Sequence, residues 1–185
     1  MKKLSLSLLL LVVMISMSGC GSSMYNYVVK PTPIKKGASK YVIRNIDLKL
    51  EHGYGRNTEN KTFKTESELK NSFKSFIEKA LTNSSMLGSG KDFNIDLNIN
   101  YKRIYNHGGN ALNRPHFYYT VKVYDSNNTL LVDYSISKST TKYSTFKDMA
   151  VGTEIAAFQW DAEDEPQDIE LISNTLVREL SELGS

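Results

Sequence analysis

The stretch that decides the fold is Phe93-Asn94-Ile95-Asp96-Leu97-Asn98-Ile99-Asn100-Tyr101. Apolar and polar side chains alternate throughout it, and successive side chains of a strand point to opposite faces of a sheet. One face of this strand is therefore apolar, and the other carries Asn and Asp. A strand of this kind covers a core on one side and meets water on the other, as is common in antiparallel sheets.

Three further segments predict strands that flank this one. Residues 41–51 place apolar side chains on one parity, with Arg44 interrupting the face: Val42, Ile46, Leu48 and Leu50. A loop containing Pro115 follows the central strand, and residues 117–124 then alternate again. The turn 125–128 leads into residues 129–140, where the predicted core positions are Leu130, Val132, Tyr134 and Ile136.

Two amphipathic helices are expected. Thr65 and Glu68 have the spacing of a capping box, and the apolar stripe that follows is Leu69, Phe73, Phe76, Ile77, Ala80 and Leu81. Near the C-terminus the stripe is Ile169, Ile172, Leu176, Leu180 and Leu183. Residues 141–165 are ambiguous, because their short apolar runs fit a short helix or a final strand.

The order of these elements predicts the α+β class. We expect a two-layer sandwich with an antiparallel or mixed sheet of about four strands and two main helices packed on one face. Residues 41–185 would form this single domain. The architecture is similar to that of small periplasmic lipoproteins of the YajG-like group. The likeness covers element order over residues 41–183 and no diagnostic motif, so it implies a fold and not a function.

The N-terminus has the layout of a secretory signal peptide over residues 1–19. Lys2 and Lys3 precede an apolar run, and small residues precede Cys20, the single cysteine. The residues Met17-Ser18-Gly19-Cys20 resemble the bacterial lipobox, with Met17 where Leu is usual. This resemblance implies cleavage between Gly19 and Cys20 and acylation of the Cys20 thiol. The alternative is an ordinary signal that leaves a free thiol, which is a liability in an oxidising compartment.

The residues after Cys20 bear on its location and partners. Gly21 stands where an Asp would retain a lipoprotein in the inner membrane, so the resemblance implies the periplasmic face of the outer membrane. The outer leaflet of a Gram-positive plasma membrane is the alternative. Residues 20–40 hold two prolines, two glycines and four lysines and are predicted to be a flexible tether. The net charge of +3 falls to +1 without Lys2 and Lys3, which argues against a nucleic-acid partner.

The sequence predicts no catalytic residue, no cofactor and no metal site. His52, His107 and His116 lack the close spacing of zinc ligands. The acidic residues between Asp161 and Glu170 lack the pattern of an EF-hand loop, and they read as a solvated helix entrance. Carboxylates that only the fold brings together stay open as a hydrolase site.

One polar strand face is a candidate surface for a partner. It carries Tyr118, Lys122 and Tyr124, with Asn98 nearby, and Tyr is enriched at interfaces. An ordinary solvated sheet surface is the alternative. We expect a non-catalytic binding or assembly accessory of the cell envelope, held in the membrane by Cys20 and in contact with another envelope protein. A carrier of a hydrophobic or glycan ligand and an envelope hydrolase are the alternatives.

Overall fold

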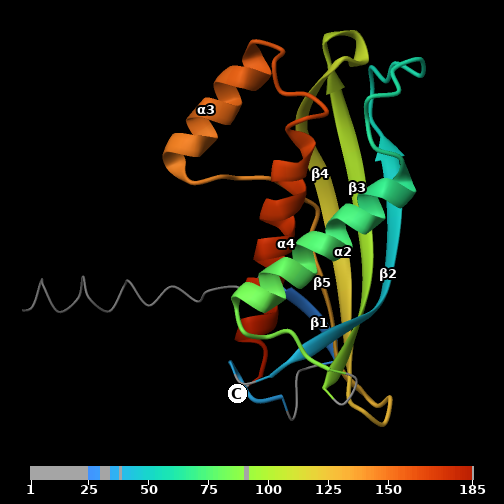
Figure 1. Cartoon of the computed structure of the whole chain (residues 1–185), viewed down its shortest axis with the longest axis vertical. Helices are drawn as coiled ribbons and strands as arrows, with labels where there is room; N and C mark the ends of the chain where they lie inside the picture. The colour runs from blue at the N-terminus through green and yellow to red at the C-terminus, as the bar shows by residue number, and fades with distance from the viewer. Residues whose placement is uncertain (1–24, 30–33, 38, 90–91, 185) are drawn as a thin grey trace, which may run out of the picture.

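The computed structural model describes residues 25–29, 34–37, 39–89 and 92–184, and the signal peptide 1–19 and Cys20 lie outside these ranges. Two long helices cross one face of a twisted sheet (Figure 1). The described elements, in chain order, are β1 (Tyr25–Val29), β2 (Tyr41–His52), α2 (Glu66–Asn83), β3 (Phe93–Asn106), the short 3-10 helix η1 (His107–Gly109), β4 (Ala111–Tyr124), β5 (Leu130–Ile136), β6 (Ser139–Thr140), α3 (Thr145–Ala156) and α4 (Glu165–Glu182).

The sheet is mixed, which is one of the two alternatives that the sequence leaves open. Its strand order is β1-β5-β4-β3-β2, with β6 paired to β4. Every neighbouring pair is antiparallel except β2 and β3, which are parallel and are joined through α2. The expected numbers of elements were too low, since the described residues form six strands and three α-helices. The additional elements are β1, β6 and α3.

The core lies between the sheet and the pair α2 and α4. The α2 stripe is confirmed: Leu69, Phe73 and Ile77 are each 0% exposed. The capping box is also confirmed, because the Glu68 backbone N–H donates to the Thr65 hydroxyl and the Thr65 backbone N–H donates to the Glu68 carboxylate. The central strand β3 buries the predicted parity, from Ile95 to Tyr101.

A bulge in β2 corrects the predicted face of that strand. The register with β3 shifts between Ile43 and Asn45, so Arg44 is an extra residue. Before the bulge Tyr41 is the buried residue, and after it the buried parity becomes that of Ile46 and Leu48. The prediction that Val42 shares the core face with Ile46 was therefore wrong, because one inserted residue exchanges the two faces of a strand.

A second bulge extends the β3–β4 hairpin beyond its predicted ends. The pairing passes from Lys102 opposite His116 to Ile104 opposite Asn113, which leaves an irregularity around Pro115. Pro115 was expected in a loop, but it lies inside β4. A bulge accommodates proline in a strand because the missing N–H is not needed for the ladder there.

Part of the predicted tether belongs to the folded domain. Residues Tyr25–Val29 form β1, the edge strand that pairs antiparallel with β5. The Tyr27 ring lies 5.9 Å from the Tyr134 ring, and Ile34 is 1% exposed within the main core. The prediction of a flexible tether over residues 20–40 is thus wrong for these positions. The alternation of side chains in this short strand covers too few residues to be recognised in the sequence, because prolines follow it closely.

The ambiguous region 141–165 contains a helix. Ser144 precedes α3, whose Val151 packs with Trp160, Tyr105 and Leu112 in a second, smaller core. This helix stands apart from the two-layer body (Figure 1). None of the helices within the described ranges is long and apolar enough to cross a membrane.

Candidate functional site

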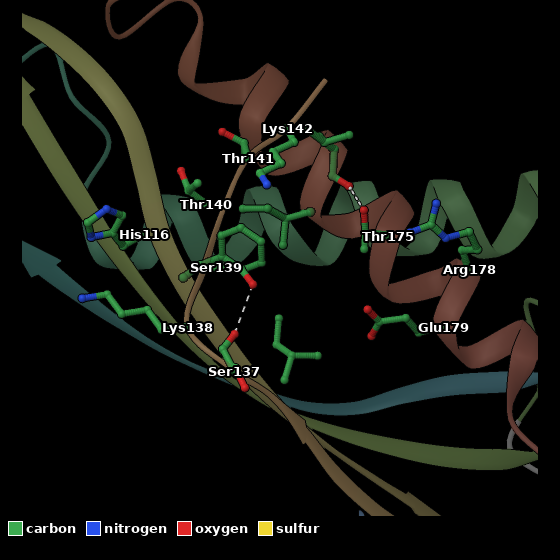
Figure 2. A pocket seen from close by; sticks show the side chains of 14 residues that line it. His116, Ser137, Lys138, Ser139, Thr140, Thr141, Lys142, Thr175, Arg178 and Glu179 are labelled. Atoms are coloured by element: carbon green, nitrogen blue, oxygen red, sulfur yellow. Dashed lines mark hydrogen bonds between the residues drawn. The ribbon is translucent and has the colours of Figure 1, made fainter. Parts of the chain in front are cut away.

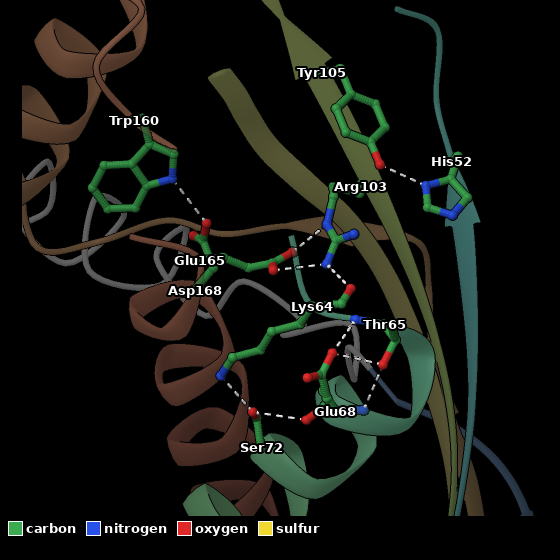
Figure 3. Close-up of polar contacts among 10 residues, drawn as sticks. All are labelled: His52, Lys64, Thr65, Glu68, Ser72, Arg103, Tyr105, Trp160, Glu165 and Asp168. Atoms are coloured by element: carbon green, nitrogen blue, oxygen red, sulfur yellow. Dashed lines mark hydrogen bonds and ion pairs between the residues drawn. The ribbon is translucent and has the colours of Figure 1, made fainter. Parts of the chain in front are cut away.

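The N-terminus of α4 is joined to β3 by a buried ion pair. Arg103 donates to both carboxylate oxygens of Glu165, at 2.6 and 2.8 Å, and also to the Lys64 carbonyl at 2.9 Å (Figure 3). Burial alone would lower the pKa of Arg103, but the bonds to Glu165 outweigh it and hold that pKa above its ordinary value. The pair fixes the helix on the sheet.

A second carboxylate one turn further along α4 has a similar structural role. Asp168 accepts from the Tyr143 hydroxyl at 2.7 Å and from the Trp160 indole N–H at 3.3 Å. Burial raises its pKa, and these hydrogen bonds oppose the rise. Because Glu165 and Asp168 are 0% and 1% exposed, the prediction of a solvated acidic helix entrance is wrong for both.

The three histidines lie apart. His52 shares a hydrogen bond of 2.6 Å with the Tyr105 hydroxyl, His107 stacks on Phe158 with ring centroids 5.0 Å apart, and His116 pairs across from Lys102 in the sheet. No cluster of three or more His, Cys, Asp or Glu side chains suited to a metal ion occurs among the residues that the structure describes.

A cavity of about 800 Å³ lies beside α4, and we call it the α4 cavity. One wall is α4, and the other is formed by the end of β5, by β6 and by the segment up to Lys142 (Figure 2). The lining residues are His116, Phe117, Ile136, Ser137, Lys138, Ser139, Thr140, Thr141, Lys142, Leu171, Ile172, Thr175, Arg178 and Glu179. The cavity is partly open to solvent.

The lining has an apolar part and a polar part. Phe117, Ile136, Leu171 and Ile172 provide the apolar surface. Hydroxyl groups surround this apolar surface. The Thr175 hydroxyl donates to the Leu171 carbonyl at 2.9 Å, and the Ser139 hydroxyl donates to the Ser137 carbonyl at 3.2 Å. An apolar lining with a few placed polar groups is the usual composition of a ligand site.

Glu179 is the carboxylate of this lining. It accepts a hydrogen bond of 2.6 Å from the Tyr119 hydroxyl beneath it. Burial raises the pKa of Glu179 to about 7, against the opposing effects of the Tyr119 bond and of Arg178. The side chain is therefore partly protonated at neutral pH. Sequence reasoning did not single it out, although Glu179 lies seven positions after Ile172 and three after Leu176, on the buried face of α4.

The predicted partner face lies on the other side of the sheet, away from the helices. The register places Asn98 opposite Thr120, between Tyr118 and Lys122 on β4. Tyr118 is 44% exposed, and the Lys122 ammonium lies 3.7 Å from Asp133. The Arg44 guanidinium covers the Tyr124 ring at 4.1 Å. The structure brings all four residues onto one surface, and their role in binding stays a prediction.

A second exposed surface lies on α3. Phe146 is 88% exposed and Met149 is 66% exposed, one helical turn apart. Phe158, just after the helix, is 49% exposed. Their sequence neighbours Val151 and Trp160 face the second core instead, so α3 presents apolar side chains on two sides.

The comparisons with known proteins give a loose likeness of fold. No protein-family model matches the chain, and no curated protein matches it. One similar solved structure is a minor lipoprotein from Acinetobacter baumannii, with 12% identity and a TM-score of 0.35 over 74% of this chain and 91% of that one. Another, from Helicobacter pylori, is described as a neuraminyllactose-binding hemagglutinin homologue, with 8% identity and a TM-score of 0.35 over 80% and 83% of the two chains.

A third is the PelC dodecamer from Paraburkholderia phytofirmans, at 7% identity and a TM-score of 0.32, covering 87% of this chain and 98% of that one. At least one of these neighbours is thus a lipoprotein.

Proposed function

We propose that the protein is a lipid-anchored, non-catalytic binding protein of the cell envelope, and that its ligand site is the α4 cavity. The observation that carries the proposal is this cavity of about 800 Å³, which lies within the range of small-molecule sites. Its apolar lining and hydroxyl groups favour the carrier alternative over a purely structural accessory. The anchor is Cys20, on the strength of the lipobox-like residues that end there.

The carboxylates argue for binding and against glycoside hydrolysis by a pair of carboxyl groups. Glu165 accepts a hydrogen bond from Arg103, and Asp168 accepts hydrogen bonds from Tyr143 and Trp160. Both carboxylates therefore hold α4 in place. Among the carboxylates of the described residues, Glu179 lines the cavity, and it accepts a hydrogen bond from Tyr119. A glycosidase needs two carboxyl groups that flank the scissile bond. The cavity lining supplies one.

The proposal also includes a location and a partner. The protein would sit on the periplasmic face of the outer membrane, or on the outer leaflet of a Gram-positive plasma membrane, and it would contact another envelope protein. Cys20→Ser is expected to abolish lipid attachment, leaving an uncleaved precursor or a soluble domain. Detergent phase separation of extracts measures this, and unchanged partitioning into the detergent phase would contradict the anchor.

Site-specific photo-crosslinking in intact cells tests the binding role. Separate probes replace Thr175 in the cavity, Phe146 on α3 and Tyr118 on the sheet face. A small-molecule adduct at Thr175 supports the carrier. A protein adduct at Phe146 or Tyr118, with none at Thr175, favours the assembly accessory instead. Absence of any adduct at Thr175, in cells where the protein is correctly anchored, overturns the cavity as ligand site.

A further inference from the structure

The α4 cavity has the charge expected of a site for an anion. Lys142 extends from the segment after β6, and Arg178 lies along α4 next to Thr175 (Figure 2). Neither forms an ion pair with a carboxylate in the described part of the chain. The carboxylate of the lining, Glu179, is partly neutral because burial raises its pKa to about 7. Lys142 and Arg178 therefore bring positive charge to the cavity, and the nearby carboxylates of Asp148 and Glu179 offset it only in part.

Two other basic residues at the rim do not share this orientation. His116 and Lys138 point away from α4, toward the other side of the β5–β6 segment (Figure 2). They belong to the outer face of the sheet, where Lys102 lies opposite His116 in register. The cavity charge thus comes from Lys142 and Arg178, and Lys138 is a natural control for it.

The cavity is also close to the predicted membrane attachment. The backbone of Tyr25, the first residue of β1, is paired with that of Ile136, which lines the cavity. Cys20 precedes Tyr25 by five residues, and five residues of fully extended chain reach at most about 18 Å. An acylated Cys20 would hold this corner of the domain within that distance of the bilayer surface. The ligands nearest to the cavity would then be membrane lipids.

We propose that the α4 cavity binds one anionic lipid, with its headgroup at Lys142 and Arg178 and an acyl chain along Ile136, Leu171 and Ile172. This inference rests on the proposed anchoring and names the ligand of the same site. Cationic side chains and hydroxyls such as Thr175 match the oxygens of a phosphate headgroup. The acyl chain of the lipid would cover the apolar lining and remove it from water, which stabilises the complex in proportion to the area covered.

The test uses the mature, lipidated protein reconstituted into phosphatidylcholine vesicles. A trace of photoactivatable lipid, with the reactive group in its acyl chain, is either phosphatidylglycerol, which is anionic, or phosphatidylcholine, which has no net charge. After illumination, labelled peptides are mapped by mass spectrometry. Phosphatidylglycerol is expected to label peptides that cover residues 136–142 and 171–179, and phosphatidylcholine is expected to label them several-fold less.

Matched variants separate the contributions. Lys142→Gln with Arg178→Gln is expected to lower the labelling by phosphatidylglycerol about fivefold or more, as loss of two partly exposed ion pairs implies. Thr175→Trp, which narrows the cavity, should lower labelling by both lipids. Lys138→Gln should change neither. Equal labelling by the two lipids, labelling confined to other peptides, or no effect of the double variant each overturns the proposal.

Vesicle flotation distinguishes this failure from failure of the proposed function. If the protein floats with the vesicles and the cavity peptides stay unlabelled, the anchor holds and the lipid site is wrong. If the protein does not float, the anchoring on which both proposals rest is wrong.

Discussion

Arg103→Leu is the change whose cost the structure defines best. The Arg103 and Glu165 side chains are 3% and 0% exposed, and two hydrogen bonds join them. Without the guanidinium, the Glu165 carboxylate is left buried without its cation. Removing one partner of such a pair costs about 3–5 kcal/mol, whereas an exposed pair contributes about 0–1 kcal/mol. We therefore expect the free energy of unfolding to fall by about 3–5 kcal/mol at pH 7.

Urea denaturation gives the measurement, and the protein carries its own probe. Trp160 is the single tryptophan, it is 1% exposed, and its indole N–H donates to Asp168 next to the pair. A double-mutant cycle with Glu165→Leu isolates the coupling between the two side chains. The variant carrying both leucines should recover much of the loss, because it leaves no buried charge without a partner.

Lys79→Leu is the matched control. Lys79 and Glu170 form an ion pair of 2.9 Å, but their side chains are 60% and 42% exposed. This variant is expected to change stability by less than about 1 kcal/mol. If Arg103→Leu costs no more than Lys79→Leu, or if the coupling energy between Arg103 and Glu165 is near zero, the buried pair does not hold α4 as described.

Three further outcomes are expected. Phe73→Ala should cost about 3–5 kcal/mol, because the ring is 0% exposed, and Lys74→Ala should cost little; equal effects in thermal melts would contradict the helix phase. A chain that begins at Ser39 lacks β1 and should unfold at lower urea concentration than one that begins at Gly21; identical midpoints would show that β1 adds no stability. Since burial raises the pKa of Glu179 from 4.5 to about 7, the associated stability is complete below pH 4.5 and is lost as the pH rises through 7. The free energy of unfolding should fall by about 2 kcal/mol between pH 4 and pH 8, after a discount for partial solvation. The Glu179→Gln variant should not show this decrease over the same pH range.

The sequence predicted the elements whose side chains repeat over many residues. In β3 the apolar parity runs without interruption from Ile95 to Tyr101, and in α2 the stripe from Leu69 to Leu81 follows a capping box. Both patterns arise from local geometry, with side chains recurring every second residue in a strand and about every 3.6 residues in a helix. The packing of α2 and α4 on one face of a mixed sheet follows from matching these apolar faces.

Irregular positions were harder to predict, because a single residue changes the outcome. The bulge at Arg44 exchanges the two faces of β2, and the bulge near Pro115 lets β4 begin earlier than its alternation suggests. The strand β1 is short and lies at the sheet edge, so its pairing with β5 depends on a partner more than 100 residues away and leaves little trace in its own sequence.

The buried polar contacts of Arg103, Glu165 and Asp168 were not predicted, although the sequence contains a pattern that indicates them. Arg103 has the same parity as Ile99 and Tyr101 in β3, which places a cation on the apolar face of a long strand. A buried cation requires a buried carboxylate, because an unpaired charge in the core is too costly. Glu165 lies four residues before Ile169, and Asp168 lies four residues before Ile172, so both continue the buried face of α4. A charged residue on an apolar parity thus has two physical explanations in this chain: Arg103 is half of a buried pair, whereas Arg44 marks a bulge. The sequence alone does not identify the carboxylate that pairs with Arg103, since the partner lies 62 residues away and only the packed fold brings the two together.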